Sequence, residues 1–542
     1  MIIRTLITAV LTAFALPLTL RYNMHMLQLN GYKNDEHLRW MKKNIRMQWI
    51  LLFLMALGLL RVFFAPAALD ILVWLTLLVT ALVYRQMKLM ATKKKLVWTP
   101  RVKRMTVTIL LLGALLLIGG MLLAAHSYVA SGAGNLAADH AEYFASAFRP
   151  AGGILPFLVG AQLLAGLLTN LVNRPIEKGI NHYYIRDAKR KLRSVPGLKV
   201  IGVTGSYGKT SVKFYLQTLL RGHFNVLVTP ESYNTSMGVV KTIRASLKPT
   251  TEIFVCEMGA RRVGDIRELC EIVHPDHGIL TAIGPQHLET FGDLEHIRDT
   301  KFELADAVPS SGMIFLNGDN EIIREKGKQY PNAIYYRSES EGEGYYASDI
   351  SVSNLGTDFT VHAPDGSTQR YQMHLIGAHN VINVVGAIAV AHALGIPLKE
   401  LVIPVRQIQP VAHRMQLLDR GAVTIIDDAY NSNPVGSKAA VENLALFDGV
   451  RILITPGMVE LGEQEEEYNR LFGTYAADCC DYILLVGRKR VVPIREGALR
   501  KGFDEKRCRV FDHLEDALSY AYSIRDEGHK YILLENDLPD NY

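Results

Sequence analysis

The chain has 542 residues, of which 49% are hydrophobic, and its formal net charge is +6 at pH 7. This length exceeds what a single hydrophobic core supports, so two to four domains are expected. The small positive excess clusters beside apolar runs, which is typical of membrane orientation, and no nucleic-acid partner is expected. The five cysteines form no C-x-x-C pair, so neither a zinc site nor a disulfide framework is predicted.

Residues 1–195 are dominated by apolar runs and are predicted to form an all-α membrane region. Five stretches are long enough, or nearly so, to span a bilayer. They cover residues 3–20, 49–65, 67–84, 105–126 and 153–173. The first has no basic segment beyond Arg4 and no small-x-small cleavage site, so it is interpreted as an anchor and not as a signal peptide. Only a short Ala/Pro break separates the second from the third, which leaves the number of spans open.

The orientation follows from the placement of lysine and arginine. Loops 21–48, 85–104 and 174–193 are rich in both, whereas the loops on the opposite side carry only Arg61 and Arg149. The positive-inside rule therefore places the N-terminus outside and everything after residue 195 in the cytosol. Anchoring to anionic headgroups accounts for most of this charge, and a grip on an anionic lipid substrate is left open.

A glycine-rich segment, residues 202–211, reads G-V-T-G-S-Y-G-K-T-S between an apolar strand-like run and a run with helical spacing. Glycines let the backbone turn tightly with its N–H groups pointing inward at a helix N-terminus, which favours anions. Lys209 is placed to reach terminal phosphates and Thr210 to bind Mg²⁺. The strict G-x-x-x-x-G-K-[ST] pattern is not met, because Val203 stands at its first glycine. The alternative is a glycine-rich turn with a surface lysine.

Residues 196–410 alternate strand-like runs with helical segments, which predicts an α/β domain with a mostly parallel sheet and helices on both faces. The runs are 200–204, 225–229, 253–256, 278–282 and 313–316. Glu257 and His287 follow two of these runs, and Lys301 comes a little later. Singly, such residues are usually solvated or structural. Their succession behind a phosphate loop predicts a site at the carboxyl edge of the sheet.

Residues 411–542 contain a second α/β alternation, with runs at 423–426, 451–455, 482–486 and 531–534. This pattern predicts a smaller, Rossmann-like domain. We therefore expect three domains. Residues 1–195 form the membrane region, residues 196–410 form the domain that binds ATP, and residues 411–542 form a C-terminal domain that closes over it.

At this point the chain resembles the Mur ligases of peptidoglycan synthesis, most closely the MurF type. The matching residues are Thr204-Gly-Ser-Tyr-Gly-Lys-Thr-Ser211, Tyr233-Asn-Thr235, Glu257-Met-Gly259, Ile283-Gly-Pro-Gln-His-Leu-Glu289, Thr300-Lys-Phe-Glu303, His379-Asn380 with Asn383, Arg414, Asp427-Asp-Ala-Tyr-Asn-Ser-Asn-Pro434 and the run 455–462. The likeness covers about residues 198–470. It does not cover the first 195, where MurF enzymes carry a soluble domain that binds the UDP of the acceptor.

The resemblance implies roles for individual residues. The nucleotide phosphates would be bound by Gly205, Ser206, Tyr207, Gly208, Lys209, Thr210 and Ser211. Asn380 would face the adenine, Arg414 would meet the phosphates when the domains close, and Asp428 would touch the ribose. Mg²⁺ would be held by Thr210, Glu257, His287 and Lys301, the last as a carbamate. The catalytic set would be Lys209, Glu257, His287 and Lys301.

Together these features predict a multi-pass protein of the bacterial plasma membrane whose cytoplasmic domains are an ATP-dependent amide ligase. ATP would activate an acceptor carboxylate as an acyl phosphate, and an amine, an amino acid or dipeptide, would attack it. Whether the acceptor is lipid-linked is left open. The tail 534–540 replaces the MurF Lys-Gly-Ser-Arg with acidic residues, so a cationic or differently shaped amine is expected. The alternatives are a poly-γ-glutamate-synthase-like ligase and an inactive nucleotide-binding scaffold.

Overall fold

The structure is a computed structural model of the whole chain. It describes every residue except 90–94, 131–139, 339–341, 354, 430–431, 489 and 537–542. By internal contacts the chain separates into two compact units, Met1–Asn181 and His182–Leu538, and each is considered by itself.

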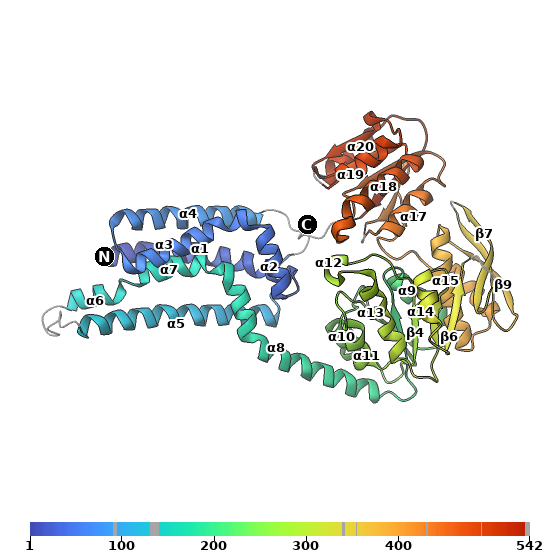
Figure 1. Cartoon of the computed structure of the whole chain (residues 1–542), viewed down its shortest axis with the longest axis horizontal. Coiled ribbons are helices and arrows are strands. Elements are labelled where there is room, and N and C mark those ends of the chain that lie inside the picture. Colours follow the sequence, from blue (N-terminus) through green and yellow to red (C-terminus); the bar gives the residue numbers. More distant parts are fainter. Residues whose placement is uncertain are drawn as a thin grey trace. The chain divides into compact units, whose positions relative to one another are not determined.

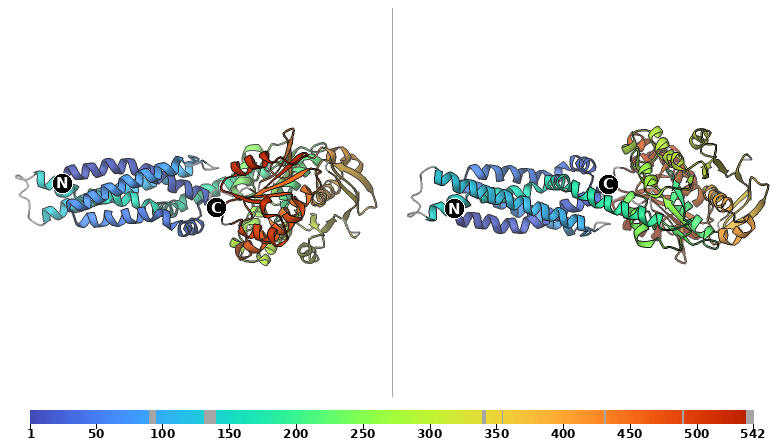
Figure 2. Two further views of the ribbon diagram at one scale, coloured as in Figure 1. Left: turned by 90° about the horizontal axis from the view of Figure 1, so that it is seen from above. Right: turned by 90° about the horizontal axis from the view of Figure 1, so that it is seen from below.

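The first unit contains helices and no strand among its described residues (Figures 1 and 2). Its helices are α1 (Ile2–Leu29), α2 (Asn34–Lys43), α3 (Ile45–Phe63), α4 (Ala67–Leu89), α5 (Pro100–Ala130), α6 (His140–Phe148), α7 (Ala151–Gly160) and the start of α8 (Gln162–Arg193). A cluster of buried apolar side chains joins α1, α3, α4 and α7, with Leu54, Val73 and Val159 fully buried.

Three of these helices, α1, α4 and α5, are long and apolar enough to cross a membrane. Two further pairs pass the same test together but are bent, α2 with α3 by 99° and α6–α7 with α8 by 78°. The expected five spans all lie on these helices, so the predicted number is reached when each bent pair counts as one span. The prediction of an all-α N-terminal region is confirmed over the described residues.

Close helix packing in this unit depends on glycine. A Cβ on Gly153 would come within 2.6 Å of the Gly58 carbonyl oxygen, and one on Gly160 within 2.5 Å of the Leu51 carbonyl oxygen. Small residues allow such backbone approach between helices in an apolar medium. These glycines therefore set how closely α3 and α7 pack.

The second unit begins with the end of α8 and continues into an α/β domain, here called the central domain. Its strands are β1 (Lys199–Thr204), β2 (Val226–Val228), β3 (Ile253–Glu257), β4 (His277–Leu280), β5 (Ile314–Asn317), β6 (Ala333–Arg337), β7 (Tyr345–Ser353), β8 (Gly356–His362) and β9 (Thr368–Met373). Among described residues they form one sheet in the order β2-β3-β1-β4-β5-β6-β7-β8-β9. Pairing is parallel from β2 to β7 and antiparallel through β8 and β9.

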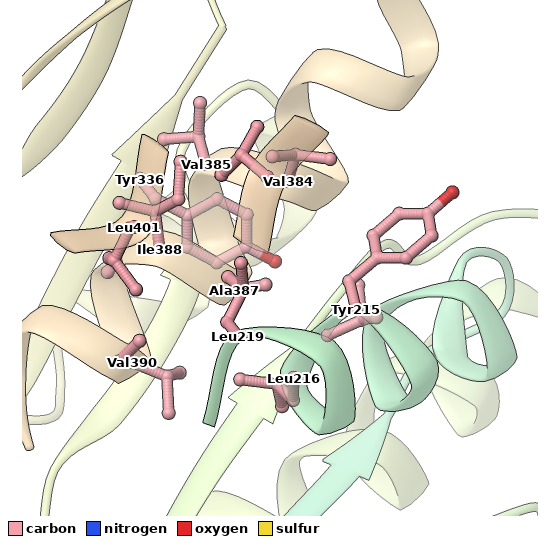
Figure 3. Packing of buried hydrophobic residues seen from close by; sticks show 14 of the residues in the cluster. Tyr215, Leu216, Leu219, Tyr336, Val384, Val385, Ala387, Ile388, Val390 and Leu401 are labelled. Atoms are coloured by element: carbon pink, nitrogen blue, oxygen red, sulfur yellow. The ribbon is translucent and has the colours of Figure 1, made fainter. Parts of the chain in front are cut away.

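Helices cover both faces of this sheet. They are α9 (Lys209–Leu220), α10 (Ser236–Ser246), α11 (Asp265–Val273), α12 (Leu288–Phe291), α13 (Leu294–Ala307), α14 (Glu321–Gly327), α15 (Ala378–Ala393) and α16 (Val402–Arg406). Because side chains alternate along a strand, Ile201 of β1 packs with α9 and α15, whereas Val200 packs with α10, α11 and α13. Figure 3 shows the first layer, where Leu216 and Leu219 of α9 face α15.

The remaining α/β elements form the C-terminal domain. Its strands are β10 (Gln416–Asp419), β11 (Val423–Asp428), β12 (Val450–Thr455), β13 (Tyr482–Val486), β14 (Cys508–Phe511) and β15 (Lys530–Glu535), and its helices are α17 (Pro434–Leu444), α18 (Glu465–Cys479), α19 (Val492–Arg500) and α20 (Leu514–Ser523). The described strands pair in the order β10-β11-β15-β12-β13-β14, parallel except for β10. The three-domain boundaries drawn from the sequence stay a prediction.

Candidate functional site

The glycine-rich loop joins β1 to α9, as the sequence predicts, although the helix begins already at Lys209. Gly205 has φ 149° and Gly208 has φ 80°, a region that side chains rarely adopt. A Cβ on Gly208 would lie 2.6 Å from the Asn383 side-chain oxygen, and one on Gly205 would collide with Thr281. Both glycines are thus required for the loop to fold back against its neighbours.

Two side chains fix this loop to the segment after β4. The Ser206 hydroxyl donates to the Gly284 carbonyl at 3.0 Å, and the Tyr207 hydroxyl donates to the Pro285 carbonyl at 2.7 Å. Ser206 and Tyr207 therefore act as supports of the loop in this structure. Ser211 lies buried in the first turn of α9.

Lys209 folds back over its own loop. Its amino group donates to the carbonyl oxygens of Gly205 at 2.6 Å and Ser206 at 3.0 Å. Burial lowers the pKa of Lys209 to about 8, and the nearby Arg414 cation acts in the same direction. A phosphate anion at this point would relieve both costs, since it supplies the negative charge that neutral carbonyls lack.

Glu257 ends β3 beside this loop, and polar groups surround its buried carboxylate. The Thr210 hydroxyl donates to Oε1 at 3.1 Å and the Asn234 amide donates to the same oxygen at 2.9 Å, while the Lys213 ammonium lies 2.8 Å from Oε2. Burial alone would raise the pKa of Glu257, but the charge and hydrogen bond of Lys213, together with the Lys209 charge and the Asn234 hydrogen bond, outweigh it and hold the pKa below its usual value. The carboxylate is therefore kept ionised.

Lys301 lies on α13, fully enclosed beside the same loop. Burial, and then the charge of Lys209, hold the pKa of Lys301 well below its usual value. Its charge in turn helps lower the pKa of His287, although burial is the larger cause there. The structure thus brings Lys209, Glu257, His287 and Lys301 into one electrostatic neighbourhood. Their catalytic and metal-binding roles remain predictions.

Three residues to which the sequence assigned no role complete this neighbourhood, although Glu460 lies in the matching run 455–462. Lys213 pairs with Glu257, as described above. Glu460, in the loop after β12, accepts a hydrogen bond from the His287 ring, and Arg261 lies 3.8 Å from Glu460. The spacing of Lys213 behind the phosphate loop was visible in the sequence, but the contact between Glu460 and His287 depends on how the two domains meet.

The expected nucleotide residues Asn380 and Arg414 both lie near α9. Asn380 of α15 is buried, where its amide donates to the Ile376 carbonyl at 2.9 Å and accepts from the Tyr215 hydroxyl at 3.2 Å. A cavity of about 920 Å³ is lined by Thr210, Phe214, Arg414, Gln407 and residues 409–413 of the segment between the two domains. This volume is in the range that accommodates a small-molecule ligand.

Asp428 ends β11 and accepts a hydrogen bond from the Met415 backbone N–H at 3.1 Å. Burial raises its pKa to about 6, although the Arg414 charge opposes this shift. Arg414 therefore lies within electrostatic reach of both Asp428 and Lys209. Arg414 precedes β10 in the segment that joins the two domains, and its role in closure stays a prediction.

The residues present fit a magnesium–nucleotide complex. Within the described chain, no group of three or more His, Cys, Asp and Glu side chains forms a ready metal site. Mg²⁺ commonly takes one or two carboxylates and completes its shell with phosphate and water, so Glu257 with Thr210 suffices as a starting pair. Lys301 fits as a further ligand only when it carries an anionic group, because a second cation would repel the metal.

The last strand ends in a buried carboxylate. Glu535 of β15 accepts hydrogen bonds from the hydroxyls of Ser432 and of Thr455, the latter at 2.9 Å. Burial raises the pKa of Glu535 to about 7. Most of the acidic tail, 537–542, and Tyr430 with Asn431 of the expected ribose segment lie outside the described residues.

Comparisons with known proteins agree on one family. A model described as "Mur ligase middle domain" matches residues 203–391, and one described as "Mur ligase, glutamate ligase domain" matches residues 413–534. A UDP-N-acetylmuramoyl-tripeptide–D-alanyl-D-alanine ligase of Bacillus subtilis is 31% identical over 341 residues, which are 61% of this chain and 72% of that protein. The enzyme of the same name from Escherichia coli is 29% identical over 340 residues, 59% of this chain and 73% of its own.

Solved structures give the same answer. MurF from Acinetobacter baumannii superposes with a TM-score of 0.60 at 25% identity, covering 66% of this chain and 77% of that one. A MurF ligase from Thermotoga maritima in complex with ADP gives a TM-score of 0.59 at 26% identity, covering 66% and 80%. The predicted resemblance is confirmed, and this chain, which is MurF-like, belongs to the Mur ligase family of ATP-dependent ligases that form amide bonds in peptidoglycan precursors.

Proposed function

We propose that this protein is a membrane-anchored Mur ligase that joins an amine to an acceptor carboxylate presented at the cytosolic membrane surface. The observation that carries the proposal is the neighbourhood of Lys209, at a phosphate loop, with the buried Glu257 and Lys301. The described part of the first unit adds three helices long and apolar enough to cross a membrane, or up to five spans if each bent pair counts as one. The proposals of membrane anchoring, of the roles of the site residues and of the kind of acceptor all rest on this combination.

The reaction proceeds in two steps. The γ-phosphoryl group of ATP passes to an acceptor carboxylate oxygen, giving an acyl phosphate and ADP. The amine nitrogen then attacks the acyl carbon, the C–O bond to phosphate breaks, phosphate leaves, and the amine loses a proton. Mg²⁺, when bound, supplies positive charge to the transferred phosphoryl group.

Named side chains serve these steps. Lys209 and the loop N–H groups bind the β- and γ-phosphates, where a fixed cation is most useful as charge develops. Glu257 and Thr210 present oxygen ligands, and Lys301 adds another as a carbamate. Arg414 reaches the phosphates from the hinge, and Asn380 and Asp428 serve the adenosine end. Contact between the domains excludes water and protects the acyl phosphate.

ATP turnover by the full chain in nanodiscs tests whether the chain is an active ligase. Phosphate release should require both an acceptor and an amine, and Lys209→Ala should reduce it by a factor of about 100 or more. No phosphate release with any acceptor and amine favours the inactive-scaffold alternative, whereas phosphate release that needs neither acceptor nor amine would show an ATPase and contradict the ligase. Turnover with glutamate as both acceptor and amine favours the poly-γ-glutamate alternative.

A second assay tests the acceptor. Two partners held in one membrane plane meet at a raised effective concentration, so weak headgroup contacts suffice. A lipid-linked acceptor should therefore react much faster than its soluble UDP-linked equivalent, and deletion of residues 1–175 should remove most of that preference. Equal rates on both acceptors would mean that the first unit only anchors the enzyme and does not contribute to selection of the acceptor.

The topology has its own test. In intact cells an impermeant thiol reagent should label Ala67→Cys, at the start of α4, and should not label Lys95→Cys, which precedes α5. The reverse pattern would place the ligase outside, away from ATP, and would contradict the proposal.

A further inference from the structure

Glu460 and His287 join the two domains of the ligase unit. His287 immediately precedes α12 in the central domain, and Glu460 lies between β12 and α18 in the C-terminal domain. The His287 Nδ1 atom is hydrogen-bonded to Glu460 Oε2, and their side chains are 16% and 20% exposed. This largely enclosed contact spans 173 residues of sequence.

Both residues also hold an unusual backbone conformation. His287 has φ 54° and Glu460 has φ 64°, in the left-handed region that costs non-glycine residues about 1 kcal/mol or more. Such a cost persists only where surrounding structure favours one placement of the side chain. Here two strained residues from different domains contact each other through their side chains.

The contact settles which ring nitrogen of His287 is available. A carboxylate only accepts hydrogen bonds, so Nδ1 carries the proton that Glu460 accepts. The neutral ring then has its lone pair on Nε2, which is the form that binds a cation. A carboxylate behind a histidine in this way fixes the ring orientation and raises its basicity.

We propose that Glu460 is a positioning residue that orients His287 Nε2 toward a divalent metal ion, so that this metal position is complete only while the two domains touch. The inference rests on the proposed function, because it assumes a metal–nucleotide complex at His287. It links metal affinity to domain contact: a metal ion bound at His287 favours the contact, and the contact favours the metal to the same degree.

Mn²⁺ is a suitable probe, since its paramagnetism reports binding without turnover. In the presence of ADP, Glu460→Ala should weaken Mn²⁺ binding to the full chain about 10- to 100-fold. Glu460→Gln should lose less, because its amide oxygen accepts the same hydrogen bond. Glu463→Ala is the matched control: it removes the same charge from an exposed position in the same loop and should change nothing.

A double-mutant comparison separates positioning from a general structural effect. If Glu460 acts through His287, the Glu460→Ala change should cost nothing further in a His287→Ala background. A loss that persists there would assign the effect to Arg261 or to Glu460 itself and overturn the proposal. Two other results would also overturn the proposal. One is an equal Mn²⁺ affinity for Glu460→Ala, Glu460→Gln and wild type, and the other is no Mn²⁺ binding by the wild-type chain.

The outcome is distinguishable from failure of the proposed function. A chain that binds Mn²⁺–ADP in a Glu460-dependent way but forms no amide with any acceptor contradicts the ligase and leaves the positioning role intact. A chain that ligates normally with Glu460→Ala, and binds Mn²⁺ as wild type does, contradicts the positioning role and leaves the ligase intact.

Discussion

The Lys213 ammonium lies 2.8 Å from a carboxylate oxygen of Glu257, and neither side chain reaches solvent. The two carboxylate oxygens of Glu257 therefore have different partners: Oε2 pairs with Lys213, whereas Oε1 accepts hydrogen bonds from Thr210 and Asn234. Lys213 is placed one helical turn after Lys209, so the two cations lie on the same side of α9. Lys209 contacts the carbonyl oxygens of the loop, and Lys213 keeps Glu257 charged and fixed in position.

The first prediction is that Lys213→Met destabilises the central domain by about 3–5 kcal/mol, since it leaves a buried carboxylate without its partner. The urea midpoint of the chain, read by proteolysis, measures this. Lys213→Met combined with Glu257→Gln should recover part of the loss, because the unpaired charge is gone. Lys248→Met, at an exposed position, is the control. Equal midpoints for Lys213→Met and the control would show that the pair contributes little.

The second prediction concerns the modification of Lys301. Burial lowers the pKa of this lysine, which favours the neutral amine, the form that reacts with CO₂. Lys301→Ala should lose about 100-fold in turnover, and added acetate or formate should restore part of it by replacing the missing anion. Lys301→Arg should be inactive and not rescued, because its side chain fills the space. An inactive Lys301→Ala that no carboxylate restores would contradict the carbamate.

The third prediction is a pH dependence of the C-terminal domain. The pKa of Glu535 is about 7 when folded against an ordinary 4.5, so the folded state binds the extra proton between these values. Stability should therefore fall as pH rises from about 5 to 8, by about 3 kcal/mol, and the Glu535 contribution is lost above pH 7. Glu535→Gln should remove most of this slope. Asp428, whose pKa is about 6, accounts for a smaller part that remains. An unchanged slope in Glu535→Gln would contradict the assignment.

Sequence patterns predicted those parts of the fold that depend on local order. The parallel strands β1–β5, β11–β13 and β15 and the phosphate loop were predicted, because each of these strands is a short apolar run followed by turn residues. Strands β7–β9 were missed because their burial alternates residue by residue on an antiparallel edge, without the intervening helices that mark a parallel sheet. That edge lies away from the candidate site.

The candidate site was likewise predicted only in part from the sequence. Lys209, Glu257 and Lys301 follow from motif order, but their environment does not. Lys213 and Glu257 are 44 residues apart and His287 and Glu460 are 173 apart, so both pairings depend on tertiary contact. The pKa shift of Lys301 likewise comes from burial, which no local pattern records.

The fourth prediction concerns a buried ion pair in the first unit. Arg61 of α3 is fully buried, and its Nε lies 2.5 Å from an Asp70 oxygen on α4. Its two Nη atoms have no hydrogen-bond partner among the described residues. Asp70 also pairs with Arg4 of α1 at 2.8 Å, but the Arg4 side chain is 32% exposed. Breaking a buried pair leaves a charge in low dielectric, whereas an exposed pair contributes little.

Asp70→Asn should therefore destabilise the helical unit by about 3–5 kcal/mol, and Arg4→Gln by less than about 1 kcal/mol. Thermal unfolding of the chain in nanodiscs, read by its tryptophans, all of which lie in this unit, measures the difference. Arg61→Met combined with Asp70→Asn should regain most of the loss, because no charge then remains buried. Arg149→Gln is the control, since that arginine is exposed. A loss for Arg4→Gln as large as for Asp70→Asn would mean that Asp70 is held mainly from α1, and that the Arg61 guanidinium contributes little to packing α3 against α4.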